Sequence, residues 1–274
     1  MRCKLKTYAI VLGLFTSMSL MSCGDSTVNI DVDDRLPPDR DTDFVAEESF
    51  SFDVEVENRS QLRVQGINGD ITITGRAGSN SVIITGTRRV GSDSLQDAQE
   101  HLQKLEVNVQ PFATEVLVQT VQPPLTGGRS YVVNYTITLP NQLAIEVANV
   151  NGLVTLDAID NDVAVNNVNG NVTLMEILGS AQVNLVNGII DSDVTLPLDG
   201  SIDLDIVNGP INLAIPVNTS ARFSATVRIG SISVSNLMLP DEISTSTSLS
   251  GTLGDGEGTI ALETDNGNIR VSGF

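Results

Sequence analysis

Few side chains in this 274-residue sequence have types and spacings suited to catalysis. Asp203 and Asp205 alternate on one predicted strand, so their carboxylates point the same way, as an acid pair of the glycosidase kind would need. The only histidine, His101, falls on a predicted helix, and Arg222 and Arg228 are the only basic residues between 141 and 235. Acid, base and substrate anchor do not converge. We therefore predict no catalytic residue and a protein that is not an enzyme, and keep a polysaccharide-cleaving enzyme as the least favoured alternative.

Cys23 is the one residue for which the sequence predicts a specific modification. The chain starts with Arg2, Lys4 and Lys6, continues with a short apolar run, and reaches Leu20-Met21-Ser22-Cys23. This order is typical of an export signal that is too short to span a bilayer. Its ending resembles the lipobox of bacterial lipoproteins, in which the cysteine is diacylated and becomes the first residue. We predict a signal peptide over 1–22 and lipid attachment at Cys23, with an ordinary cleaved signal as the alternative.

The charge and cysteine content exclude several classes of partner. Removal of residues 1–22 takes away three basic residues and no acid, which leaves 12 basic against 34 acidic residues and a net charge of −22. Such a charge repels nucleic-acid phosphates, so no nucleic-acid partner is expected. Cys23 would be the only cysteine of the mature chain and cannot form an internal disulfide. With one histidine besides, we predict no metal site and no cofactor.

Residues 23–48 combine acidic residues with Pro37-Pro38 and few apolar side chains. This composition predicts a disordered tether between the membrane and the folded domain. The acids are Asp25, Asp31, Asp33, Asp34, Asp39, Asp41, Asp43, Glu47 and Glu48. A calcium loop is the alternative, but the spacing lacks the central glycine and terminal glutamate of the known loop.

A short motif recurs through the remainder of the chain. Val150-Asn151-Gly152 is followed by equivalents at Gly170, Gly188 and Gly209, at steps of 18, 18 and 21 residues. Related corners occur earlier at Ile67-Asn68-Gly69 and later at Ile229-Gly230 and Asn266-Gly267. A fixed period near 20 residues indicates stacked supersecondary units.

The residues on both sides of each corner alternate between apolar and polar. The second residue after the glycine is β-branched and apolar in every copy: Ile71, Val154, Val172, Ile190, Ile211, Ile232 and Ile269. The fifth residue before it is also apolar: Val64, Val147, Val165, Val183, Leu204, Ala225 and Leu262. Such alternation predicts two half-buried strands per copy, and the change of parity requires a bend at the Asn-Gly. Separate Asn-Gly hairpins are the alternative.

We predict an all-β fold: a β-solenoid, as a single-stranded right-handed β-helix of about seven coils over 49–274. Residues 141–235 are expected to hold five coils in succession, followed by an irregular stretch over 239–257. The long interval between the first two corners predicts an α+β insertion over 76–140. This insertion would contain a helix over 92–106, with Leu95 on its buried face and a cap at Ser94, and would pack as a cap on the column.

The polar residues of the strands should form flat outward ladders. After the corner they are Thr72, Thr155, Thr173, Asp191, Asn212, Ser231, Ser233 and Asn268; before it they include Glu146, Asn166, Gln182, Asn184, Asp203, Asp205 and Glu263. These faces are either a solvated wall or a hydrogen-bonding surface for a protein or glycan. The corner residues Asn151, Asn169, Asn187 and Asn208 are expected to stack as an internal ladder with a structural role.

Several features together resemble one family. They are the coil pattern, Leu139-Pro140 before the serial coils, the inserted helix, Leu253-Gly254-Asp255-Gly256, and Thr264-Asp265-Asn266-Gly267. They resemble the bacterial family of candidate adhesins with β-helical domains, and the head domains of autotransporter-type adhesins. The resemblance covers about 49–274 and implies binding rather than catalysis, with no ligand residues to carry over.

The sequence thus predicts an exported, lipid-anchored protein of the outer membrane or cell surface. It would act as an adhesin through its solenoid faces, on a protein or glycan ligand, with the membrane contacted through the acyl chains. A periplasmic lipoprotein with a structural or regulatory role in the envelope is the alternative.

Overall fold

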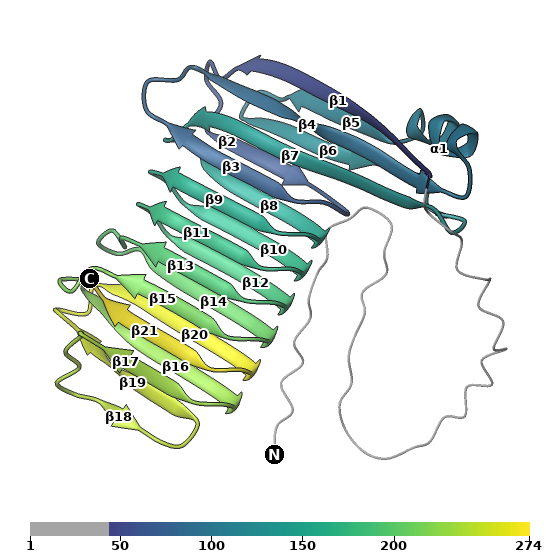
Figure 1. Ribbon diagram of the computed structural model, residues 1–274. Coiled ribbons are helices and arrows are strands. Elements are labelled where there is room, and N and C mark those ends of the chain that lie inside the picture. Colours follow the sequence, from purple (N-terminus) through teal and green to yellow (C-terminus); the bar gives the residue numbers. More distant parts are fainter. Residues whose placement is uncertain (1–43) are drawn as a thin grey trace, which may run out of the picture.

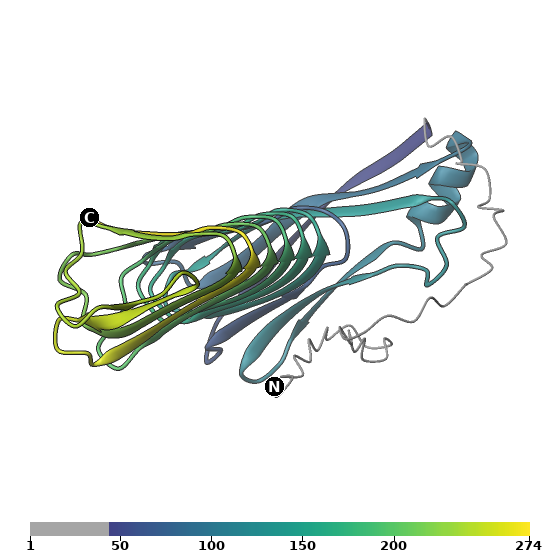
Figure 2. The ribbon, with the colours of Figure 1, turned by 90° about the horizontal axis from the view of Figure 1, so that it is seen from below.

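The computed structural model describes residues 44–274, so the expected signal peptide, Cys23 and most of the acidic tether lie outside the described residues. Two sheets face each other across the core (Figures 1 and 2). Sheet A contains, in spatial order, β1 (Phe44–Glu55), β4 (Ser81–Ser92), β7 (Ser130–Pro140), β3 (Ile71–Arg76), β9 (Val154–Ile159), β11 (Val172–Ile177), β13 (Ile190–Val194), β15 (Ile211–Ile215), β21 (Ile269–Gly273) and β17 (Ile232–Ser235).

Sheet B has a matching order. Its strands are β18 (Ile243–Ser244), β19 (Ser248–Leu253), β16 (Ala221–Ile229), β20 (Gly258–Asn266), β14 (Ser201–Asn208), β12 (Ala181–Asn187), β10 (Val163–Asn169), β8 (Ala144–Asn151), β2 (Gln61–Gln65), β6 (Glu115–Val121) and β5 (Glu106–Pro111). No helix among residues 44–274 is long and apolar enough to cross a membrane.

Each repeat is one coil: a strand of sheet B, a corner at the glycine, and a strand of sheet A. Equivalent strands of successive coils pair in parallel and in register, as Val165 of β10 does with Val183 of β12. The hairpin alternative is therefore wrong, because the two strands joined at a corner belong to different sheets. Gly188 shows why glycine is needed: its φ is 150°, and a Cβ there would lie 2.2 Å from the carbonyl oxygen of Gly170.

In-register stacking puts each inward side chain directly beside its equivalents. Leu204 of β14 pairs with Val183 on one side and Leu262 of β20 on the other, and all three are buried. Ser192 breaks the apolar column, but its Oγ donates to the carbonyl oxygen of Asn212 at 3.1 Å. The core is thus a continuous aliphatic column in which each buried side chain contributes ~1.5–3 kcal/mol.

The spatial order of the coils departs from chain order at the C-terminal end (Figure 1). β20 pairs with β14 on one edge and with β16 on the other, and β21 lies likewise between β15 and β17. The expected succession of five coils over 141–235 is therefore wrong for the fifth, because the last coil of the chain is intercalated beneath it. The stretch 239–257, expected to be irregular, forms β18 and β19, which extend sheet B in antiparallel pairing.

The inserted segment 76–140 lies at the opposite end of the stack (Figure 1), where it continues both sheets by edge pairing. Its helix, α1 (Leu95–Leu102), is shorter than expected but begins at the expected cap, where Ser94 Oγ accepts from the Asp97 backbone N–H at 3.2 Å. Leu95 is half exposed rather than buried. The tether boundary expected at residue 48 is also corrected, because β1 pairs with β4 from Phe44 onward and buries Ala46.

Candidate ligand-binding recess

The acidic pair that the sequence singles out lies on the outer face of sheet B. Asp203 and Asp205 are outward residues of β14, and Asp205 lies next to Glu263 of β20. His101 is at the far end of the molecule, on α1, where its Nδ1 is 3.0 Å from the Asp97 carbonyl oxygen. The structure therefore does not bring this histidine and the two carboxylates together.

The charged cluster around α1 is a structural clamp. Asp97 accepts two hydrogen bonds from Arg129, 2.7 Å from Nη2 and 2.5 Å from Nε, and a third from the Ser92 hydroxyl. The Arg129 hydrogen bonds, followed by that from Ser92, hold the pKa of the Asp97 carboxyl well below its usual range. Such charge-assisted, bidentate contacts fix the helix to the start of β7 and leave no free acid or base.

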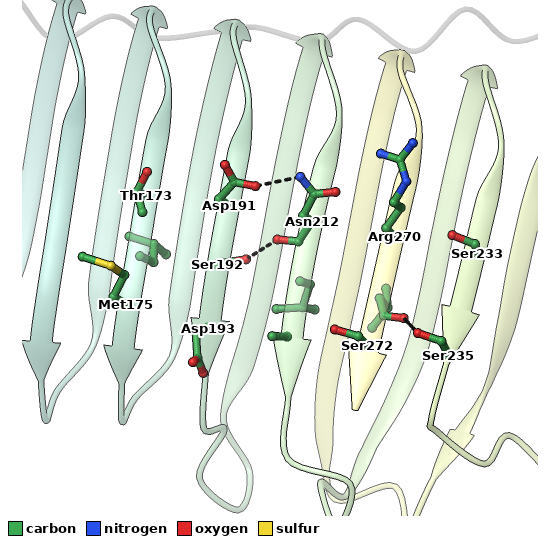
Figure 3. Close-up of a pocket in the computed structure, with 14 residues that line it drawn as sticks. Thr173, Met175, Asp191, Ser192, Asp193, Asn212, Ser233, Ser235, Arg270 and Ser272 are labelled. Atoms are coloured by element: carbon green, nitrogen blue, oxygen red, sulfur yellow. Dashed lines mark hydrogen bonds between the residues drawn. The ribbon is translucent and has the colours of Figure 1, made fainter. Parts of the chain in front are cut away.

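A recess of about 510 Å³ lies on the outer face of sheet A and crosses β11, β13, β15, β21 and β17 (Figure 3). Its labelled residues are Thr173, Met175, Asp191, Ser192, Asp193, Asn212, Ser233, Ser235, Arg270 and Ser272. The volume lies within the range of small-molecule binding pockets. The outward ladder of the sequence prediction supplies Thr173, Asp191, Asn212 and Ser233 to this recess.

The recess exists because two small outward residues lie beside larger ones. At the fifth position after each corner glycine, β11 carries Met175 and β13 carries Asp193, whereas β15 and β21 carry Ala214 and Ser272. Parallel pairing sets these positions side by side. The fall in side-chain size leaves a depression whose floor is Ala214 and Ser272. A size change at one repeat position is a signal that the sequence contains, but the intercalated strand order is needed to read it.

Hydrogen bonds fix several of the lining groups. Asn212 Nδ2 donates to Asp191 Oδ1 at 2.7 Å, and the hydroxyl of Ser235 donates to the carbonyl oxygen of Val271 at 3.3 Å. The sheet backbone below is paired on both sides of β13, β15 and β21. The recess is therefore preorganised, which lowers the entropic cost of binding.

Two charged groups have unusual surroundings. Partial burial raises the pKa of the Asp193 carboxyl above its ordinary value. The Arg270 side chain is exposed and makes no ion pair or hydrogen bond with any residue between 44 and 274. The recess thus presents one guanidinium and one carboxylate to solvent, besides the carboxylate of Asp191 that is shared with Asn212.

The corner asparagines form the predicted ladder. Each Nδ2 donates to the Oδ1 of the preceding coil, over 2.7 Å for Asn169 to Asn151, 2.8 Å for Asn187 to Asn169 and 2.9 Å for Asn208 to Asn187. The ladder continues to Asn68 and Asn266. Its residues are exposed, so the expectation of an internal ladder is wrong in that respect. The inward amides, Asn149 and Asn167, were missed because they occupy a position that is apolar in other coils.

No group of three or more His, Cys, Asp or Glu within the described part of the chain could hold a metal ion. The acidic stretch proposed as an alternative calcium loop lies almost wholly outside that part.

Comparison with known proteins gives one family and several distant structures. The model of the family described as Toastrack DUF4097 matches residues 20–272. No curated protein matches the chain. A candidate cell adhesion protein from Clostridium sporogenes is 13% identical, with a TM-score of 0.49 and coverage of 84% of this chain and 100% of that chain. A candidate adhesin from Bacteroides fragilis is 12% identical, with a TM-score of 0.27 and coverage of 83% and 97%. A candidate lipid-binding protein from Parabacteroides distasonis is 9% identical, with a TM-score of 0.24 and coverage of 81% and 96%.

Proposed function

The chain belongs to the Toastrack DUF4097 family, and from this premise we propose that it is an adhesin-like binding protein of the cell envelope. It is exported, anchored through acyl chains on Cys23, and binds a protein or glycan ligand at the outer face of sheet A. The observation that carries the proposal is the recess of about 510 Å³ lined by outward polar side chains from five adjacent strands.

The anchoring part of the proposal comes from the sequence alone. Leu20-Met21-Ser22-Cys23 follows a basic and apolar start, and several acyl chains give a lasting membrane attachment, which one chain alone does not. The acidic tether would then separate the folded domain from the membrane surface and leave the solenoid faces open to ligands.

Filling the recess tests the binding site. We expect Ala214→Trp to weaken ligand binding at least about tenfold, because the indole would occupy the space above the floor. Purified full-length protein would be applied to immobilised glycans and envelope proteins, and bound protein measured by surface plasmon resonance. Ala164→Trp, at an outward position of sheet B, is the matched control and should bind like the wild type. Equal binding by wild type and Ala214→Trp would remove the recess from the function.

Cellular location is tested by protease treatment of intact and permeabilised cells, followed by blotting for this protein. An adhesin on the cell surface is digested in intact cells, while a periplasmic marker protein stays protected. Protection of this protein until the envelope is opened would contradict surface adhesion and support the periplasmic alternative.

One observation favours that alternative, in which the protein contacts another envelope protein. Five adjacent layers each place a large, at least half-exposed apolar side chain at the corner that follows sheet A or at the C-terminus. These residues, here called the corner stripe, are Leu178, Leu198, Val217, Phe274 and Met238. Two layers are joined directly, because the Val217 N–H donates to the Phe274 carbonyl oxygen at 3.0 Å. Contiguous exposed apolar surface is typical of protein contacts.

A further inference from the structure

Arg270 is a cation placed in a strongly acidic chain without an acidic partner. It lies on β21, directly between Asn212 of β15 and Ser233 of β17. The nearest carboxylate of its row, on Asp191, is two strands away and already accepts from Asn212. Two strand spacings amount to roughly 10 Å between backbones. The guanidinium is therefore available to a ligand anion.

The rest of the lining suits hydroxyl groups. It consists of small hydroxyl side chains, one amide and two carboxylates, with Met175 as the only large apolar side chain that is exposed. Carboxylates, amides and hydroxyls accept or donate hydrogen bonds to sugar hydroxyls. A peptide strand is less well served, because peptides add to sheet edges or fill apolar pockets, and the backbone beneath this recess is already paired.

We propose that the recess binds a glycan that bears a carboxylate, with Arg270 as the carboxylate partner and Asp193 and Asn212 as partners of the sugar hydroxyls. This inference rests on the proposed binding function and names its ligand class. A guanidinium matches the planar carboxylate with two parallel N–H···O bonds, as lysine does not.

The charges limit the ligand to one carboxylate within the recess. Asp191 and Asp193 lie on β13, toward the Met175 side, whereas Arg270 lies toward β17. A second carboxylate over β13 would meet like charges and lose affinity. A terminal acidic sugar on an otherwise neutral chain fits this arrangement, and a polymer with a carboxylate on every sugar does not.

The test uses two probes that differ in one group: a trisaccharide ending in glucuronic acid and the same trisaccharide ending in glucose. With the purified full-length protein we expect the acidic probe to bind about tenfold more tightly, as measured by calorimetry at low salt, and the advantage to shrink in 0.5 M NaCl. Arg270→Gln should remove the advantage and leave the affinity for the neutral probe unchanged. Arg222→Gln is the matched control, because Arg222 is also exposed and makes no ion pair within 44–274, but lies on sheet B.

The outcomes separate the two proposals. Equal binding of the two probes, or an acidic advantage that survives in Arg270→Gln, overturns the carboxylate assignment. If both probes then still lose affinity in Ala214→Trp, the recess remains the binding site and only the ligand class is wrong. If Ala214→Trp binds both probes like the wild type, the proposed function of the recess fails as well. Absence of binding by both probes to the wild type also overturns the assignment of a glycan ligand.

Discussion

A chain that ends at Glu257 is expected to lose the cooperative folding of its C-terminal coils and to aggregate. The missing residues supply β20 and β21, which bury Ile260, Leu262, Ile269 and Val271. At ~1.5–3 kcal/mol each, these four side chains stabilise the fold by an amount comparable with the whole net stability of about 5–15 kcal/mol of a typical domain. Their removal also leaves the edges of β14, β15, β16 and β17 unpaired, and open edges promote aggregation.

Thermal unfolding followed by circular dichroism, together with size-exclusion chromatography, measures this loss. Two substitutions within β20 separate burial from general damage to the strand. Leu262→Asn should reproduce most of the effect because Leu262 is buried, whereas Ala261→Asn should be nearly neutral because Ala261 points outward. A truncated chain that remains monomeric and melts like the wild type would show that the last coil is dispensable.

Gly188→Ala is expected to lower the free energy of unfolding by about 3 kcal/mol or more. The φ of 150° alone strains an alanine by roughly 1–3 kcal/mol. The added Cβ would also lie 2.2 Å from the Gly170 carbonyl oxygen, a backbone atom of the previous coil that the stacked pairing holds in place. Relief requires separation of two coils, so the cost extends beyond the mutated residue.

Gly78→Ala is the matched control. Gly78 also has a positive φ, of 75°, but a Cβ there would meet nothing within 4 Å. Only backbone strain of about 1–2 kcal/mol is then expected. Urea unfolding with a shared slope m gives both losses. If the two substitutions cost the same, close approach between coils is not the reason for glycine at the corners.

Much of the column could be predicted from sequence because its signals are local and repeated. The change of parity at Gly152, Gly170, Gly188 and Gly209 indicates a bend between two half-buried strands, and in-register stacking then places equal residues side by side. That geometry also predicts the hydrogen-bonded ladder of corner asparagines. Ser94 identifies the start of α1 for a similarly local reason, since its side chain caps the helix three residues later.

The order of the last coils could not be predicted, because equal repeats fit any slot. Leu204 is as good a neighbour for Ala225 as for Leu262, and the period does not distinguish them. The recess depends on that order, since its floor joins Ala214 and Ser272, which are 58 residues apart in the chain. Arg270 was missed for the same reason: it reaches the recess only because β21 lies between β15 and β17.

The intercalated coil also affects the timing of folding. Coils up to β15 can dock on their predecessors as the chain is synthesised, since each new coil needs only the one before it. The coil of β16 and β17 has no finished neighbour when it emerges, because the residues that separate it from β14 and β15 come last. At about 5–20 residues per second, synthesis from Ala221 to Phe274 takes roughly 3–10 s. During this interval two coils wait with bare strand edges, and the final seventeen residues close the protein.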